Sequence, residues 1–216
     1  MTPETLRQTI IETARRMNGL GINHGTSGNV SAREAKGFLI TPSGMDYDDL
    51  TVEDIVPVTL AGDASGRRNP SSEWRFHKDI YVARAEIGAI VHTHSPYATT
   101  LACLQKEIPA FHYMVAAAGG KRIPLAAYAT FGEQALSDSI LAALGATYTA
   151  CLIANHGLIA CGATLEKALA LAVEVETLSG MYWRALTLGD PVILADAEMD
   201  RVLEKFKTYG AQPKPR

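Results

Sequence analysis

"ACLIANHGLIAC", residues 150–161, constrains how the chain can fold, because two short apolar runs lie on either side of a three-residue turn, Asn-His-Gly. A parallel crossover needs a dozen or more residues, so the runs at 150–154 and 157–161 should pair as antiparallel strands. Helical patterns flank this pair, at 132–145 before it and at 164–189 after it. The sequence therefore predicts a mixed or mainly antiparallel sheet with helices packed against it.

Helices and short strands alternate along the rest of the chain. Apolar residues recur at helical spacing at 2–19, 71–84 and 196 to about 209, and turn residues bound four more apolar runs, at 37–40, 54–60, 88–92 and 122–128. In the first helix, Thr2 is the expected N-cap and Gly19 the end. With 47% apolar and 20% charged content, residues 1–216 fit one α/β domain in which helices enclose the sheet as three layers.

The composition favours a soluble protein that binds a small molecule. The net charge is −3 and the basic residues are scattered. No signal-peptide pattern and no run of about 18 apolar residues occurs. We therefore expect a cytoplasmic protein that binds neither nucleic acid nor a membrane. The three cysteines, Cys103, Cys151 and Cys161, lack CxxC spacing and lie among apolar residues, which predicts buried core positions.

Histidines follow two of the predicted strands. Side chains two residues apart in an extended segment point to the same face, so His92 and His94 should project side by side. His156 lies in the tight turn, where Gly157 can adopt the backbone angles of a sharp bend. Three imidazoles at strand ends, completed by a carboxylate, would suit zinc. For each histidine alone, a hydrogen-bonded structural role is the alternative.

Three short turns rich in Gly, Ser and Thr lie in the first third of the chain: "GTSGN" (25–29), "TPSG" (41–44) and "PSS" (70–72). Such turns can direct backbone N–H groups and hydroxyls at an anion, and a helix N-terminus adds a favourable dipole. Turn formation and N-capping explain any one of them, but three beside a candidate metal site indicate a phosphate pocket. Ser71 or Ser72 should cap the helix at 71–84. Glu73 then falls in its first turn, as a dipole-stabilised acid or a carboxylate beside the metal.

Taken together, these motifs resemble the class II, zinc-dependent aldolase family. The similarity extends from about Gly25 to Gly210 and includes "GTSGNVSAR", "LITPSGMDYDDL", "PSSEWRFH", "VHTHSPYATT", "IPAFHYMVAAAGG", "AYATFG", "NHGLIACG" and "EKFKTYG". The resemblance implies an α/β domain of the class II aldolase/epimerase superfamily. It also implies a homotetramer with active sites at subunit interfaces.

The resemblance further implies roles for individual residues. One zinc ion per subunit would have four ligands: Glu73, His92, His94 and His156. Glu73 would also act as the base, Tyr113 as the proton donor, and Phe131 and Tyr209 would line the aldehyde side. Seven residues of the small-residue turns would bind the substrate phosphate: Thr26, Gly28, Asn29, Ser43, Gly44, Ser71 and Ser72.

The implied reaction cleaves a ketose 1-phosphate, L-fuculose 1-phosphate or a related deoxy sugar phosphate, to dihydroxyacetone phosphate and a small aldehyde. Breaking a bond beside a carbonyl leaves a carbanion, which a metal can stabilise through neighbouring oxygens. In the reverse direction, a carboxylate at the edge of the metal site can remove the proton.

Three alternatives remain. A sugar-phosphate 4-epimerase of the same superfamily typically carries Asp where Glu73 stands, and a decarboxylase of phosphorylated sugar acids would keep the same loops and metal. A non-catalytic interaction domain on this fold, as in adducin heads, should have lost metal ligands.

Overall fold

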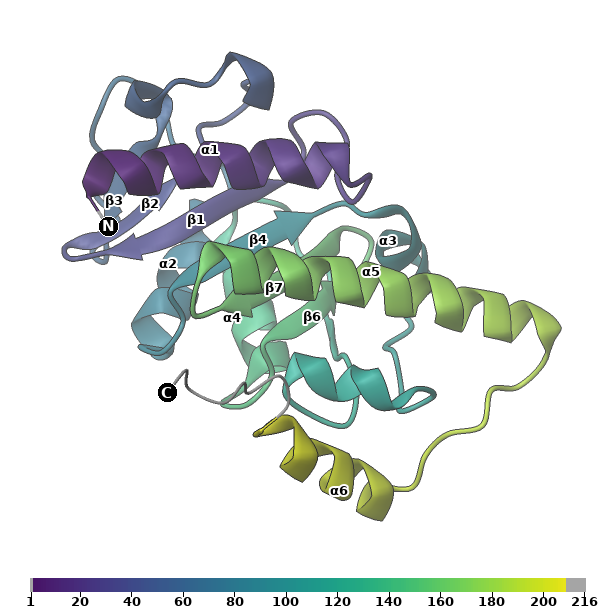
Figure 1. Cartoon of the computed structure of the whole chain (residues 1–216). Coiled ribbons are helices and arrows are strands. Elements are labelled where there is room, and N and C mark those ends of the chain that lie inside the picture. Colours follow the sequence, from purple (N-terminus) through teal and green to yellow (C-terminus); the bar gives the residue numbers. More distant parts are fainter. Residues whose placement is uncertain (1, 209–216) are drawn as a thin grey trace, which may run out of the picture.

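The computed structural model describes residues 2–208. A seven-stranded sheet with the order β3-β2-β1-β4-β7-β6-β5 crosses the middle of the molecule (Figure 1). Only β5 and β6 pair in parallel; the other neighbours are antiparallel. The strands are β1 (Asn29–Glu34), β2 (Gly37–Ile40), β3 (Val56–Thr59), β4 (Ala89–Thr93), β5 (Leu125–Ala126), β6 (Ala150–Ile153) and β7 (Gly157–Gly162). The predicted antiparallel pairing around the Asn-His-Gly turn is confirmed, with Ile153 opposite Gly157.

Helices cover both faces of this sheet, which confirms the three-layer α/β architecture. Figure 1 shows α1 and α5 crossing in front of the strands, with α2 and α4 behind them. The helices are α1 (Pro3–Gly19), α2 (Trp74–Ala83), α3 (Pro96–Cys103), α4 (Gln134–Leu144), α5 (Leu165–Leu188) and α6 (Asp196–Phe206). Short 3-10 helices are formed by Tyr47–Asp49, Val52–Asp54 and Tyr113–Ala118. Helix α6 packs through Met199 against Ala110 and Ala116 rather than against the sheet.

Each face of the sheet has its own apolar core. Val91 and Leu152 belong to the core beneath α1, α3 and α5, and Ile90 and Ile153 to the core beneath α2 and α4. Full burial of one such side chain stabilises the fold by about 1.5–3 kcal/mol. The sheet is therefore held rigidly from both sides, and so are the residues at its strand ends.

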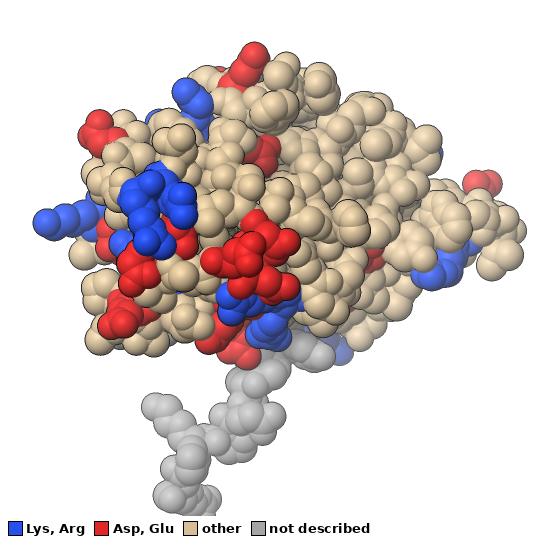
Figure 2. Space-filling view, turned by 90° about the horizontal axis from the view of Figure 1, so that it is seen from above, with Lys and Arg blue, Asp and Glu red and all other residues tan. Residues whose placement is uncertain are grey.

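Charged side chains of both signs are exposed. On the face seen in Figure 2, Lys and Arg side chains lie close to Asp and Glu side chains, and much of the remaining surface is uncharged. Within residues 2–208, no helix is long and apolar enough to span a membrane.

One strand and one α-helix were not predicted from the sequence. Strand β1 was not predicted because Ser31, at an inward position, is buried by hydrogen bonds to His77 and Tyr81 and not by its own apolarity. Helix α3 was not predicted either, although Pro96 occupies its first position, where a missing N–H group is tolerated. The strand predicted at 122–128 is reduced to Leu125–Ala126.

Two finer predictions were wrong. Helix α2 begins at Trp74 with Glu73 at the N-cap position, and neither Ser71 nor Ser72 caps it. Ser71 instead forms the turn before the helix: its Oγ accepts a hydrogen bond from the Glu73 N–H at 3.3 Å and its carbonyl oxygen accepts one from the Trp74 N–H at 3.1 Å, so Glu73 is left at the N-cap position. Among the cysteines, Cys151 and Cys161 are buried as predicted, but Cys103 is exposed at the end of α3.

Candidate active site and metal centre

The end of β4 and the β6–β7 turn bring three histidines together. His92 lies on β4, His94 follows the end of this strand, and His156 lies in the turn. Their ring centroids are 4.8–5.0 Å apart, with interplanar angles of 73–89°. Nε2 of His92 lies 3.1 Å from Nε2 of His94. Two neutral imidazole nitrogens this close repel each other through their lone pairs unless a proton or a cation lies between them.

The geometry of the turn differs from the expected one. Asn155, not Gly157, takes the left-handed conformation, with φ of 54°. Gly157 is required for a different reason, because a Cβ there would lie 2.4 Å from the carbonyl oxygen of Thr93. The glycine therefore lets the turn approach the end of β4 closely enough to place His156 beside the other two histidines.

Glu73 completes the group from the start of α2. Its Oε2 lies 3.2 Å from Nε2 of His92, and its Oε1 lies 3.1 Å from Nε2 of His156. All four potential ligand atoms lie within 4.8 Å of one another. Glu73 is 5% exposed, yet its Oε1 has no hydrogen-bond partner among residues 2–208. A buried carboxylate oxygen left in this state is expected to be satisfied by a cation.

The protonation states suit a metal site. Burial raises the pKa of the Glu73 carboxyl, but His92 and His156 outweigh this effect and hold the pKa below its usual range. Burial, with smaller contributions from His92 and His156, lowers the pKa of His94 to about 3. Nδ1 of His92 lies 2.8 Å from the carbonyl oxygen of Leu158, so Nδ1 carries a hydrogen and Nε2, when it has no hydrogen, can direct its lone pair at a metal. An ionised carboxylate with neutral imidazoles is the donor set that metal binding requires.

A cavity of about 340 Å³ opens beside this cluster. Its walls come from five chain segments and comprise Thr26, Ser27, Ser72, Glu73, His94, Tyr128, Ala129, Phe131, Asn155 and His156. Tyr128 and Phe131 are 62% and 66% exposed, so they form an open aromatic side to the cavity. Tyr128 was not among the predicted site residues, although "AYATFG" contains it and Phe131.

The small-residue turns meet near this cavity. The N–H of Ser43 donates to the carbonyl oxygen of Asn69 at 3.2 Å, which joins the 41–44 turn to the 69–72 segment. Gly28 brings the 25–29 turn against β4, since a Cβ there would lie 2.5 Å from the carbonyl oxygen of His92. Gly44 adopts a positive φ of 67°. The three turns predicted to bind phosphate therefore lie beside the histidine cluster.

Two predicted site residues are placed differently, and a third lies outside the described part of the chain. The Asn29 side chain is directed at Glu73, with its Nδ2 2.9 Å from Oε2, and it is only 2% exposed. Tyr113 is 47% exposed and lines another cavity, with Phe111 and Val202, between the Tyr113–Ala118 helix and α6. Tyr209 lies outside the described residues. Among residues 2–208, Tyr113 therefore lines a different cavity from the one beside Glu73.

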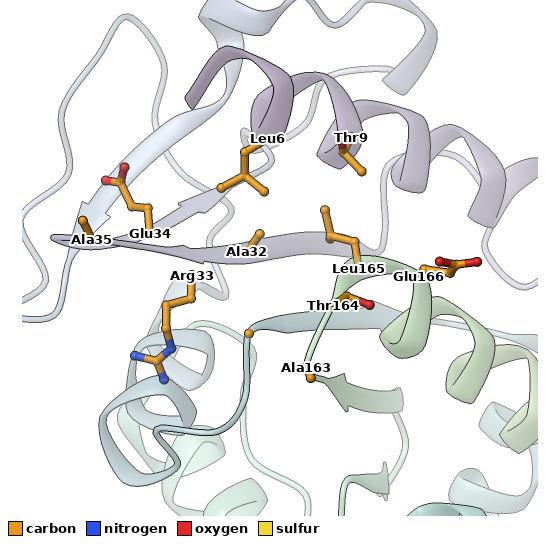
Figure 3. A pocket seen from close by; sticks show the side chains of 11 residues that line it. Leu6, Thr9, Ala32, Arg33, Glu34, Ala35, Ala163, Thr164, Leu165 and Glu166 are labelled. Atoms are coloured by element: carbon orange, nitrogen blue, oxygen red, sulfur yellow. The ribbon is translucent and has the colours of Figure 1, made fainter. Parts of the chain in front are cut away.

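A larger cavity, of about 680 Å³, lies at the opposite end of the sheet between α1 and α5 (Figure 3). Leu6 and Leu165 project toward each other across it, with Ala32 of β1 between them. Arg33 points to the other side of β1, where its guanidinium donates to the carbonyl oxygens of Ile87, of Tyr81 on α2 and of Arg84. The lining includes neither histidine nor cysteine, so this cavity provides no metal ligands of the kind found around Glu73.

A carboxylate from α5 supports the histidine segment. Oε1 and Oε2 of Glu176 accept hydrogen bonds from the backbone N–H groups of Tyr97 and Ala98, both at 2.8 Å. These N–H groups belong to the first turn of α3, where an anion is favoured by the helix dipole. Because α3 begins two residues after His94, Glu176 also fixes the direction in which the chain leaves the site.

Comparisons with known proteins agree with this geometry. Residues 8–183 match the family described as Class II Aldolase and Adducin N-terminal domain. The 5-methylthioribulose-1-phosphate/5-deoxyribulose-1-phosphate aldolase of Rhodospirillum rubrum is 56% identical over 205 residues, 95% of this chain and 92% of that protein. The L-fuculose phosphate aldolase of Escherichia coli K12 is 49% identical over 211 residues, 97% of this chain and 98% of that protein. A solved L-fuculose 1-phosphate aldolase superimposes with a TM-score of 0.91 at 39% identity, covering 96% of this chain and 98% of that one.

The chain therefore belongs to the class II aldolase and adducin N-terminal domain family. Within this family it is a class II aldolase, a lyase that makes and breaks carbon–carbon bonds, with a His/Glu site that can bind a metal.

Proposed function

We propose that this aldolase uses zinc to cleave a ketose 1-phosphate, L-fuculose 1-phosphate or a related deoxy sugar phosphate, to dihydroxyacetone phosphate and a small aldehyde. The observation that carries the proposal is the convergence of Glu73 and three histidines within 4.8 Å, beside a cavity bordered by Gly/Ser/Thr turns. Relatives named for 5-methylthioribulose 1-phosphate, 5-deoxyribulose 1-phosphate and L-fuculose phosphate support a phosphorylated sugar as substrate.

Zinc is the proposed metal because three imidazoles and one carboxylate form a donor set that it commonly takes. When bound, it would supply Lewis acidity to the substrate carbonyl and the adjacent hydroxyl. The four ligands are Glu73, His92, His94 and His156, with one ion per subunit.

Glu73 is the proposed base. In the cleavage direction the substrate hydroxyl at C4 loses its proton and the C3–C4 bond breaks. Glu73, which first takes up a proton from solvent, then delivers it to C3 and becomes ionised again. In the aldol direction, Glu73 removes that same proton from dihydroxyacetone phosphate. Its Oε1 is suited to this role because no hydrogen bond from residues 2–208 occupies it.

Phosphate binding is proposed for the three small-residue turns. Thr26 and Ser72 line the cavity, and the hydrogen bonds between the 41–44 and 69–72 segments hold Ser43, Gly44 and Ser71 close by. Gly28 belongs to the same surface. Asn29 can contribute only its backbone to this pocket, because its side chain is bonded to Glu73 and His77.

Tyr113 is proposed to act from a neighbouring subunit of a homotetramer. Its phenol is exposed and lies in a different cavity from the histidines of its own chain, so it is accessible to a partner. In the aldol direction its phenol would donate a proton to the C4 alkoxide, and in cleavage its phenolate, after loss of that proton to solvent, would accept the proton of the C4 hydroxyl. Phe131, together with Tyr128, forms an apolar side that favours an aldehyde with a methyl or methylthio end.

The test is a coupled assay for dihydroxyacetone phosphate released from a panel of ketose 1-phosphates, with metal content measured on the same protein. We expect turnover of at least one deoxy or methylthio sugar phosphate and a much lower rate with the matching unphosphorylated sugar, because charge-assisted contacts are lost. Equal rates with L-fuculose and its 1-phosphate would contradict the phosphate pocket. If the fully active enzyme sedimented as a monomer, Tyr113 could not act from a neighbouring subunit.

A further inference from the structure

A chain of four hydrogen bonds leads from Glu73 into the interior of the protein. Oε2 of Glu73 lies 2.9 Å from Nδ2 of Asn29, and Oδ1 of Asn29 lies 2.5 Å from Nε2 of His77. Nδ1 of His77 then lies 2.7 Å from Oγ of Ser31, which is 2.8 Å from the hydroxyl oxygen of Tyr81. All five residues are at most 5% exposed.

The chemistry of the donors fixes the direction of every bond. An ionised carboxylate can only accept, so Asn29 must direct its NH₂ group at Glu73 and its carbonyl oxygen at His77. His77 must therefore donate from Nε2, which leaves Nδ1 of the neutral ring as an acceptor. Ser31 then donates to His77, and Tyr81 donates to Ser31. The four bonds all run toward Glu73, an arrangement in which each bond polarises the next.

His77 is suited to the middle of this chain. Complete burial, reinforced by nearby His92, lowers the pKa of His77 to about 3, so the ring stays neutral and keeps one donor and one acceptor. Phe76 stacks against the ring with centroids 4.6 Å apart, which restricts its rotation. His77 also lies on α2 one turn after Glu73, so one rigid helix carries both residues.

We propose that His77 is a positioning residue for Glu73 and acts through the amide of Asn29. With Nε2–H of His77 in place, the amide cannot rotate and bring its carbonyl oxygen against the carboxylate. Oε2 of Glu73 is thereby held, and Oε1 remains the oxygen available to a metal or a substrate proton. This role rests on the function proposed for Glu73.

The test compares two substitutions at the same position. His77→Phe keeps a flat ring but removes both nitrogens, whereas His77→Gln retains one N–H donor and one oxygen acceptor. On metal-free protein, we expect the Kd for Zn²⁺, measured by competition with a chelating dye, to rise at least ~10-fold in His77→Phe, the scale seen when a partner of a metal ligand is lost. We expect kcat to fall by a similar factor with KM nearly unchanged. His77→Gln should recover most of both losses.

Ile80→Ala is the matched control for damage to the same helix. Ile80 is fully buried on α2, so its truncation should lower Tm, but it makes no bond in the chain and should leave the Kd for Zn²⁺ unchanged. Wild-type Kd and kcat in His77→Phe would overturn the positioning role alone. Wild-type protein that binds no metal would instead overturn the function proposed for the site.

A measurement on the unmodified protein keeps the proposal testable even if His77→Phe does not fold. In protein labelled with ¹⁵N-histidine, long-range ¹H–¹⁵N correlation spectra distinguish the two neutral imidazole tautomers, and His77→Gln assigns the signal by its absence. We expect His77 to carry its hydrogen on Nε2. A hydrogen on Nδ1 would reverse the chain and overturn the proposal.

Discussion

Replacing Glu73 by glutamine separates the chemistry of the site from its shape. The two side chains have nearly the same size, so the amide oxygen of glutamine can still accept from Nδ2 of Asn29, where Oε2 now lies at 2.9 Å. The amide nitrogen then takes the place of Oε1, 3.1 Å from Nε2 of His156. A negatively charged oxygen is thus exchanged for a neutral donor that cannot accept a proton.

The size of the effect follows from this exchange. Loss of a positioned general base lowers a rate by about 10²–10⁴-fold, which corresponds to about 3–5 kcal/mol of transition-state stabilisation. The new N–H group also competes with the metal for His156, so zinc occupancy should decrease unless zinc is supplied in excess. Phosphate binding should survive, because none of the small-residue turns is altered.

The assay is the exchange of solvent deuterium into dihydroxyacetone phosphate in the absence of any aldehyde, which reports only on proton removal from the donor carbon. We expect Glu73→Gln to exchange at least ~10²-fold more slowly than wild type. Glu166→Gln makes the same chemical change at an exposed position beside the cavity at the opposite end of the sheet and should exchange at the wild-type rate. If Glu73→Gln exchanged as fast as wild type at equal zinc content, another group would have to be the base.

Two other substitutions test supporting contacts. Glu176→Ala removes the acceptor of the Tyr97 and Ala98 N–H groups. We expect it to lower the free energy of unfolding, measured with urea, by about 1–3 kcal/mol and to weaken the affinity for zinc. An unchanged free energy of unfolding and an unchanged zinc affinity would show that α3 does not need this cap. For Asp54, burial raises the pKa, but hydrogen bonds from Arg68 and other partners outweigh it and leave the pKa below its usual range. The unfolded chain therefore takes up the Asp54 proton first as the pH falls, so this stabilisation is present above pH ~4 and is lost as the pH decreases further. Asp54→Asn should be less stable than wild type at pH 7, and the difference should shrink in acid; a constant difference between pH 7 and pH 3 would contradict the assignment.

The sequence predicted the elements whose determinants are local. The turn between 153 and 157 is too short for a parallel connection, and this alone excluded a purely parallel sheet. His92 and His94 were expected on one face because a strand alternates its side chains. Thr2 was recognised as an N-cap and does accept a hydrogen bond from the Thr5 N–H at 3.2 Å.

Features that depend on distant contacts were not predictable. Ser31 is buried because α2, more than forty residues later, supplies His77 and Tyr81 as partners. The role of Asn29 depends on the register that places it opposite His92, which no local pattern encodes. Asn29 was therefore assigned to the phosphate, whereas its side chain is bonded to Glu73.

The dependence of turnover on a stoichiometric metal is the most direct test of the site. The purified enzyme would be stripped with a chelator, assayed for dihydroxyacetone phosphate release from its ketose 1-phosphate, and titrated with zinc alongside His92→Ala. We expect activity to disappear on stripping and to return linearly up to one zinc ion per subunit in wild type, with no recovery in His92→Ala. Full activity in metal-free protein, or equal recovery in His92→Ala, would contradict a catalytic metal held by Glu73 and the three histidines.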